Sequence, residues 1–251
     1  MKKQFIIIAG IVLAFSACKK DSTPKSTQLL KKLTLIDNGD TTITNLTYDN
    51  SKKMTLFKAN DGTESKFTYT GEKLTVLEIK LDANNKTKLE ITYDGAKAKT
   101  AVNTIYQNNE VKFTYKVAYT TDASNRVTEI LIKNNENTST IGKHVFSYVN
   151  NNVSKIQSYV GETLTTTRDF TYGTKKSPFL NSNLKHVVDV SLAQFYSANE
   201  IVKQKYNIGN VEREIINSYT FDSQNFPLTA NVSEKVIPSG TPEVTKLVFG
   251  Y

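Results

Sequence analysis

Few side chains in this sequence are suited to chemistry. Its 251 residues include two histidines, His144 and His186, and a single cysteine, Cys18. A histidine that orients a serine or a carboxylate can support nucleophilic or acid–base catalysis. Neither histidine lies near a Gly-x-Ser-x-Gly sequence; His144 opens an expected strand, and His186 falls in an irregular segment. We therefore expect neither to be catalytic.

Other reaction types are equally poorly supported. The sequence has no His/Cys/Asp/Glu spacing typical of zinc, no Asp-x-Asp-x-Asp-Gly calcium loop and no glycine-rich phosphate loop. Paired carboxylates for glycoside hydrolysis would come from separate strands, so they leave no local motif. Glu129 and Glu136 are one such pair, although solvated strand charges explain them equally well. We predict no enzyme activity, no metal and no cofactor, and keep a hydrolase of this kind as an alternative.

Cys18 indicates a different chemistry, namely lipid attachment. It follows Lys2-Lys3, an apolar run from Phe5 to Phe15, and Ser16-Ala17. This order is typical of a signal peptide, and the apolar run is too short to cross a bilayer. A cysteine directly after small residues resembles the lipobox of bacterial lipoproteins. The resemblance implies cleavage before Cys18 and acyl chains on it; the alternative is an ordinary secretory signal with an incidental cysteine.

The domain organisation follows from this cleavage. We expect a signal peptide over residues 1–17, a lipidated cysteine and disordered polar tether over 18–28, and one all-β domain over 29–251. Lipid on Cys18 would attach the protein to a membrane of the cell envelope. The outer membrane is the favoured location, and the periplasmic or surface-exposed side stays open. Because Cys18 is the only cysteine, an intramolecular disulfide is excluded.

The charge of the chain is positive without forming a compact basic motif. Removal of residues 1–17 takes away Lys2 and Lys3 and lowers the formal net charge from +8 to about +6. The lysines are scattered between threonines along expected strands, which is typical of a solvated sheet face. Nucleic acid is not an expected partner, because a basic module with interleaved aromatic residues is missing. The partner classes that remain are a protein, a glycan or a lipid.

One unit recurs along the chain. In residues 66–79, Phe67 and Tyr69 alternate with threonines, Gly71-Glu72 forms a turn, and Leu74 and Val76 run back. We predict a β-hairpin with Tyr69 opposite Leu74 and Phe67 opposite Val76. Units of about 24 residues can be aligned on an aromatic residue at a strand end: Tyr48, Tyr69, Tyr93, Tyr119, Tyr148, Tyr172 and Phe221. Turn signals alternate between the two ends of these strands, which predicts an antiparallel meander of about 16 strands.

The spacing on the return strands predicts curvature. Apolar residues stand three apart in Leu74/Leu77, Val127/Ile130 and Val153/Ile156. A regular strand would place the two members of each pair on opposite faces, whereas a β-bulge would bring both to one face and bend the strand. One bulge in each unit would curl the sheet into a trough or a barrel. The alternative is a sheet covered on both faces.

Two further features concern the ends and the interruption of the pattern. Residues 180–197 lack alternation and predict a short helical or irregular insertion that could cap the curled sheet. Residues 32–36 match the return half of a unit, and residues 247–251 match the outgoing half. We hypothesise that these two strands pair and close the sheet.

The recurring apolar-Thr-Tyr-Asp motif, as in Leu46-Thr-Tyr-Asp49 and Ile91-Thr-Tyr-Asp94, resembles the YD repeats of bacterial RHS-type shell proteins. It resembles more closely a group of lipid-anchored envelope proteins of unknown function with degenerate YD-like units. The likeness extends over most of residues 30–251, but the Gly-Arg of true YD repeats is missing, as in Asp49-Asn-Ser-Lys52. The resemblance implies no activity.

The favoured function is therefore a non-catalytic, lipid-anchored binding or interaction module with an unknown ligand. The first alternative is a carrier or sensor that holds an apolar or glycan ligand within the curled sheet. A hollow, apolar interior would favour the carrier, and a filled core with an exposed aromatic patch would favour the interaction module.

Overall fold

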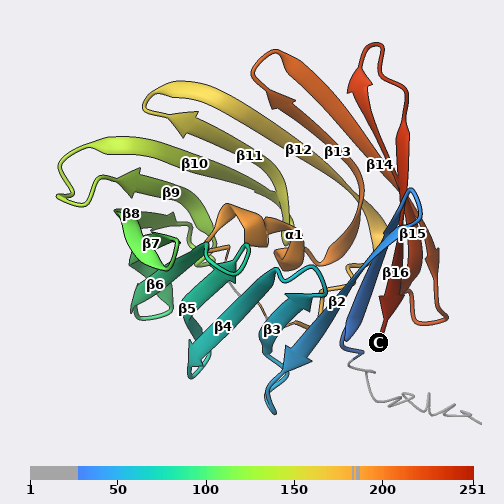
Figure 1. The fold of residues 1–251 in the computed structure, drawn as a ribbon, viewed down its shortest axis with the longest axis horizontal. Helices are drawn as coiled ribbons and strands as arrows, with labels where there is room; N and C mark the ends of the chain where they lie inside the picture. Colours follow the sequence, from blue (N-terminus) through green and yellow to red (C-terminus); the bar gives the residue numbers. More distant parts are fainter. Residues whose placement is uncertain (1–27, 183, 185–186) are drawn as a thin grey trace, which may run out of the picture.

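The computed structural model describes residues 28–182, 184 and 187–251, and these form a closed antiparallel β-barrel (Figure 1). Cys18, His186 and residues 1–27 lie outside the described part of the chain. Each strand pairs with its neighbour in sequence, as the alternating turns predicted. The described strands are β1 (Lys32–Asp37), β2 (Asp40–Tyr48), β3 (Met54–Ala59), β4 (Glu64–Thr70), β5 (Lys73–Lys80), β6 (Lys86–Asp94), β7 (Lys97–Gln107), β8 (Glu110–Thr121), β9 (Val127–Lys133), β10 (Thr140–Val149), β11 (Asn152–Val160), β12 (Thr163–Lys176), β13 (Asn199–Ile208), β14 (Val211–Phe221), β15 (Pro227–Ile237) and β16 (Glu243–Gly250).

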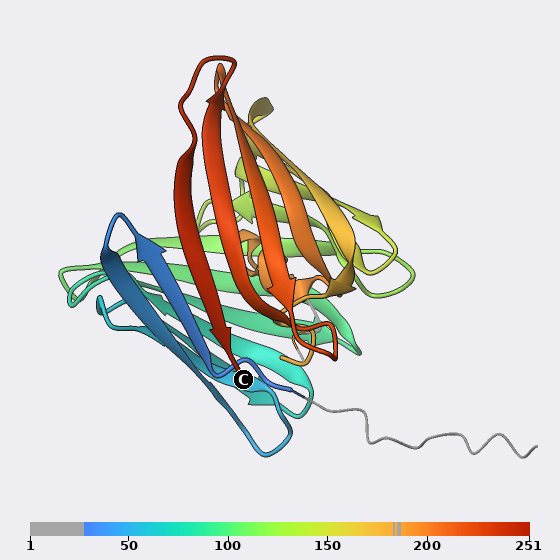
Figure 2. The same ribbon diagram turned by 90° about the vertical axis from the view of Figure 1, so that its right-hand side faces the viewer.

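The first and last strands close the sheet. β1 pairs with β16 in antiparallel register, with Leu33 opposite Phe249 and Leu35 opposite Leu247. Figure 2 shows the two strands side by side near the C-terminus. The hypothesis that the two half-units join is confirmed, and the edges that an open meander would expose are paired.

A β-bulge near the turn gives the hairpins their curvature. In β4–β5 the register shifts between Thr68 and Tyr69, so that Tyr69 lies opposite Leu74 and Phe67 lies opposite Leu77. The predicted pairing of Phe67 with Val76 is wrong, because the bulge adds one residue to the return strand. Leu74 and Leu77 are both buried, as the three-residue spacing predicted. The hairpins β2–β3, β6–β7, β8–β9, β10–β11 and β14–β15 shift register at the corresponding end.

The repeat tyrosines connect neighbouring units. The hydroxyl of Tyr69 donates to the carbonyl of Met54 at 3.0 Å, and that of Tyr93 donates to Leu74 at 2.8 Å. In the last unit the hydroxyl comes from Tyr219, two residues before the aromatic residue that the alignment selected. We call the barrel end where these hydroxyls lie the tyrosine end; its members are Tyr48, Tyr69, Tyr93, Tyr119, Tyr148, Tyr172 and Tyr219.

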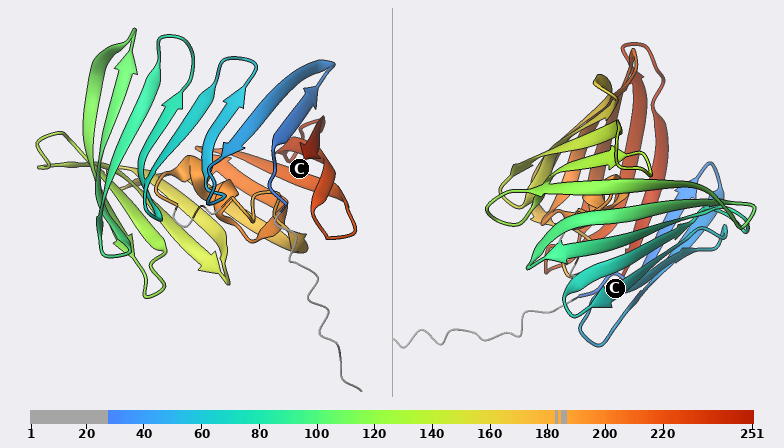
Figure 3. Two further views of the ribbon diagram at one scale, coloured as in Figure 1. Left: turned by 90° about the horizontal axis from the view of Figure 1, so that it is seen from below. Right: turned by 90° about the vertical axis from the view of Figure 1, so that its left-hand side faces the viewer.

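The described residues of the segment between β12 and β13, namely 177–182, 184 and 187–198, form a plug inside the barrel at the tyrosine end. It includes a 3-10 turn, η1 (Val190–Leu192), and one helical turn, α1 (Ala193–Tyr196), and it runs between the two halves of the wall (Figure 3). Its buried apolar side chains are those of Leu184, Val187, Val188 and Leu192. The predicted insertion near residues 180–197 is confirmed.

Hydrogen bonds hold the plug to the wall. The hydroxyl of Tyr119 donates to the carbonyl of Val188 in the plug at 2.9 Å. The corresponding tyrosines of other units, such as Tyr93 and Tyr148, donate to a carbonyl of the barrel wall instead. The side-chain oxygen of Asn152 accepts from the backbone N–H groups of Ala198 and Asn199 at 2.8 and 3.2 Å. The plug is therefore an integral part of the core.

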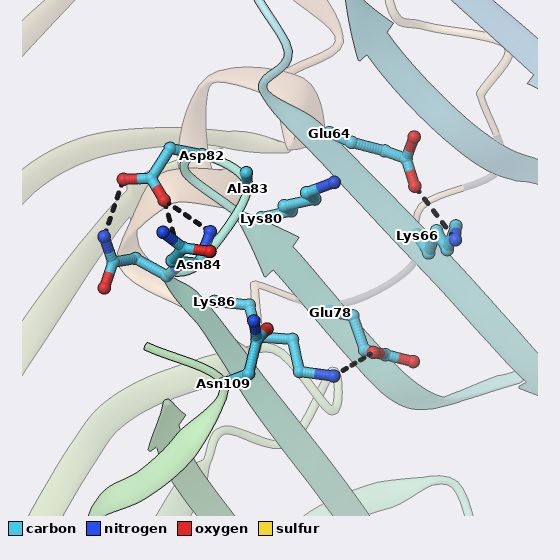
Figure 4. Close-up of a pocket in the computed structure, with 10 residues that line it drawn as sticks. Glu64, Lys66, Glu78, Lys80, Asp82, Ala83, Asn84, Lys86 and Asn109 are labelled. Carbon is cyan, nitrogen blue, oxygen red and sulfur yellow. Dashed lines mark hydrogen bonds and ion pairs between the residues drawn. The ribbon is translucent and has the colours of Figure 1, made fainter. Parts of the chain in front are cut away.

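The outer face of the barrel carries ion pairs, most of which cross between strands. Glu64 of β4 pairs with Lys58 on β3 and with Lys66 on its own strand, and Glu214 pairs with Lys203 and Lys235 on the two neighbouring strands. A polar depression of about 220 Å³ lies on this face around the turn between β5 and β6, and Figure 4 shows side chains that line it. Its side chains pair mainly with one another, as Lys86 does with Glu78 at 3.9 Å. Within the described residues, no helix is long and apolar enough to cross a membrane.

Candidate ligand-binding site

The interior of the barrel is hollow beside the plug. A cavity of about 260 Å³ lies against β1, β3, β13–β16 and the plug. Its aromatic lining comes from Phe57, Phe179, Phe195, Tyr219 and Phe249. Its aliphatic lining comes from Leu33, Ile201, Ile215, Val232 and Leu247. These side chains face inward because each occupies the core-facing parity of its strand or projects from the plug.

Phe195 of α1 contacts aromatic rings of both the barrel wall and the plug. Its ring centroid lies 5.5 Å from that of Phe57 on β3 and 4.6 Å from that of Phe179 in the plug. On the opposite wall the rings of Tyr219 and Phe249 are 6.4 Å apart. Aromatic rings at such distances pack favourably in edge-to-face or tilted arrangements. These ring contacts hold the side chains that line the cavity in position.

The cavity also contains a small number of amides. Asn217 is fixed by a hydrogen bond from its Nδ2 to the carbonyl of Ile201 at 2.8 Å. Gln204 of β13 reaches the edge of the cavity, and no hydrogen bond of its side chain occurs among the described residues. A mostly apolar cavity with a few placed polar groups is the usual form of a small-molecule site.

A second, more polar cavity adjoins the first. It has a volume of about 250 Å³, and its lining includes Arg168, Ser191 and Gln204. The guanidinium of Arg168 lies 6.0 Å from the ring centroid of Tyr206. Since Arg168 lies opposite the core residue Ile156 in the β11–β12 register, its side chain belongs to the inner face. Gln204 lines both cavities, which are therefore neighbours.

Three neighbouring interior side chains, those of Arg213, Tyr206 and Glu234, form a hydrogen-bonded group without net charge. Arg213 donates to Glu234 at 2.9 Å, and the Tyr206 hydroxyl donates to the same carboxylate oxygen at 2.7 Å. The hydrogen bond from Tyr206, assisted by that from Arg213, holds the pKa of Glu234 below its usual value. The carboxylate is therefore ionised and paired at neutral pH.

His144, one of the two histidines considered for catalysis, lies in the wall. Its Nδ1 is 2.8 Å from the Ser158 Oγ on the neighbouring strand. Burial lowers the pKa of His144, because it disfavours the charged imidazolium, while Asp189 opposes this shift. Asp189 uses its Oδ1 to accept from the N–H and hydroxyl of Ser191 at 2.9 and 2.6 Å. The pair of His144 and Ser158 thus ties β10 to β11.

The carboxylates do not converge at the cavity. Glu129 lies within β9, whereas Glu136 lies in the exposed turn beyond its end, so the structure does not bring this pair together. Glu200 is buried, and burial raises its pKa, but it packs against Gly173 in the wall. Among the described residues, no group of three His, Cys, Asp or Glu side chains could hold a metal ion.

The residues that form the two cavities were not identified from the sequence. Phe195 and Gln204 come from segments whose neighbours are set only by barrel closure. Arg168 had a weak signal, because the sequence has only three arginines among 32 basic residues. Two of them, Arg168 and Arg213, occupy inward-facing positions, while the outer face carries lysines.

Comparison with known proteins identifies the fold and corrects the predicted family. No protein-family model and no curated protein matches the chain. A porin-like protein from Bacteroides uniformis is similar in structure with a TM-score of 0.56 and 13% identity, over 88% of this chain and 96% of that one. A porin-like protein from Bacteroides vulgatus matches with a TM-score of 0.51 and 13% identity, over 89% of this chain and 98% of that one.

The resemblance to RHS-type YD repeats, and to envelope proteins with YD-like units, is therefore wrong. The chain forms a closed 16-stranded barrel with a porin-like fold. The apolar-Thr-Tyr-Asp motif encodes one strand end and its turn, which any antiparallel meander can use. Such a motif determines a hairpin and leaves the arrangement of many hairpins undetermined.

Proposed function

We propose that this protein is a lipid-anchored cell-envelope protein that holds an apolar ligand inside its barrel. The observation that carries the proposal is the cavity of about 260 Å³, lined by the barrel wall and by Phe179 and Phe195 of the plug. Its aromatic and aliphatic lining would release water on binding an apolar group, which is favourable in proportion to the area buried. The carrier is thus preferred over the interaction module that the sequence favoured.

The charged residues on the outer face favour a barrel that stands in water beside a membrane over one that spans it. Barrels that span a membrane carry an apolar band on their outward face. Here the outward positions of the wall include ion pairs such as Lys155 with Asp169 and Lys88 with Glu90. The plug also fills the interior at the tyrosine end, which favours retention of a ligand over conduction.

The predicted tether fits this arrangement. Asn181 of the plug donates to the carbonyl of Gln28 at 2.8 Å, and Leu30 is buried at the tyrosine end. The chain therefore enters the barrel at that end. Lipid on Cys18 would hold this end toward the membrane, with the opposite barrel mouth directed away.

A cavity-filling substitution tests the proposal. The full chain is titrated with N-phenyl-1-naphthylamine, a neutral dye whose fluorescence rises in apolar sites. Val232→Trp places an indole in the cavity and should abolish the rise, whereas Val248→Trp, on the outward face of β16, should leave it unchanged. Unfolding in urea identifies a variant that has lost its fold. Equal dye binding by both folded variants, or none by the unaltered protein, would refute the proposal.

A further inference from the structure

The two interior cavities are neighbours and differ in character. Gln204 lines both the apolar cavity and the polar cavity of about 250 Å³ that contains Arg168. Together their volumes fall within the range of roughly 300–1,000 Å³ found for small-molecule sites. A ligand that fills both would have an apolar part on one side of Gln204 and a polar part on the other.

Arg168 supplies the charge on the polar side. Its side chain is exposed to the interior, and no ion pair of its guanidinium occurs among the described residues. The other inward arginine, Arg213, is already neutralised by Glu234 at 2.9 Å. The acidic group on the plug side, Asp189, accepts hydrogen bonds from Ser191, and burial lowers the pKa of His144, which disfavours a positive charge there.

We propose that the barrel binds a single-chain anionic amphiphile, with its tail in the apolar cavity and its anionic head group at Arg168. A guanidinium presents a planar set of donors that matches a carboxylate or a phosphate in a bidentate manner. The guanidinium lies 6.0 Å from the ring centroid of Tyr206, at the outer limit of a cation–π contact, so this contact leaves its donors available to a head group. This inference rests on the proposed function and specifies the ligand class.

The test compares three ten-carbon probes by isothermal titration calorimetry with the full chain: decanoate, decyl phosphate and decanol. We expect the anionic probes to bind about tenfold or more tightly than decanol, as charge-assisted hydrogen bonds provide. Arg168→Gln should remove this preference and leave decanol binding unchanged. Lys155→Gln, the same change of charge on the outer face of the neighbouring strand, should leave all three affinities unchanged.

The outcomes separate the two proposals. Similar affinities for decanol and the anions, or a preference that survives Arg168→Gln, would overturn the anionic head group while the apolar site stands. Failure of all three probes to bind would refute the apolar site as well. Tighter binding of decyl phosphate than decanoate would assign the head group to phosphate, and the reverse order would assign it to a carboxylate.

Discussion

The Tyr69 hydroxyl lies 3.0 Å from the Met54 carbonyl oxygen, and this contact joins one hairpin to the preceding one. Met54 is the first residue of β3, and Tyr69 is near the end of β4. Tyr93 makes the same connection to Leu74, the second residue of β5. In both units the tyrosine hydroxyl thus donates a hydrogen bond to a carbonyl group that lies next to the β-bulge of the preceding hairpin, at the tyrosine end.

Truncation of Tyr69 should measure the contribution of this contact. Tyr69→Ala should lower the free energy of unfolding by about 3 kcal/mol, because it removes a largely buried ring. Tyr69→Phe should cost about 1 kcal/mol, since it removes the hydroxyl alone. Urea unfolding provides the measurement, with Tyr106→Phe on the outer face under Lys86 as the control. A loss below about 0.5 kcal/mol for Tyr69→Ala would contradict the assigned core position.

Alkaline pH should weaken the tyrosine end. Burial raises the pKa of Tyr172 to about 12, against about 10 for an unfolded tyrosine. The folded state keeps its proton where the unfolded state loses it, so this stability is present below pH ~10 and is lost between pH ~10 and ~12. Tyr172→Phe should be less stable than the unaltered protein at pH 8, because it lacks the 2.7 Å bond to Val153. This difference in the free energy of unfolding, measured with urea, should become smaller above pH 10. A difference that stays constant would contradict the raised pKa of Tyr172.

Barrel closure can be tested by a disulfide across the seam. Thr34 and Val248 are paired on β1 and β16, and paired residues lie about 4.5–5.5 Å apart, within reach of a disulfide. Thr34→Cys with Val248→Cys, in a Cys18→Ser background, should form an intramolecular bridge on oxidation. Non-reducing electrophoresis and mass spectrometry detect it. Thr34→Cys with Val244→Cys, about 13 Å further along β16, should remain reduced; equal yields would argue against the seam.

Lipid attachment at Cys18 is a separate prediction. Expression with radioactive palmitate should label the unaltered protein, because the lipobox cysteine is the expected site of acylation. Cys18→Ala should remove the label and release the protein from the membrane fraction. Persistent labelling of the variant would show that the lipobox interpretation is wrong.

The local geometry could be predicted because it is encoded in short spacings. The three-residue step from Leu74 to Leu77 identified the bulge, and the complementary half-units identified the seam of β1 and β16. The exact partner of Phe67 was missed because a β-bulge shifts the register by one residue. The predicted pairing assumed a regular hairpin and did not include the bulge. The absence of alternation near residues 180–197 identified the plug.

The site could not be predicted in the same way. Phe57, Phe195 and Leu247 meet only after the barrel has closed and the plug has entered it. Their separations in sequence exceed 50 residues, so no local pattern records the contact. The motif that suggested YD repeats failed for the same reason, since it describes one hairpin and the fold is decided by the arrangement of all of them.

The seam between β1 and β16 also bears on how the protein reaches its native state. Residues 32–36 find their partners some 210 positions later, at residues 246–250, so β1 keeps one unpaired edge until β16 has been made. Pairings of such high sequence separation form slowly, because the loop-closure entropy is lost before the contacts repay it. During this interval the open edge can pair with other chains. Rapid pairing of the intervening hairpins would shorten the time for which this edge is open and would favour closure of the barrel over aggregation.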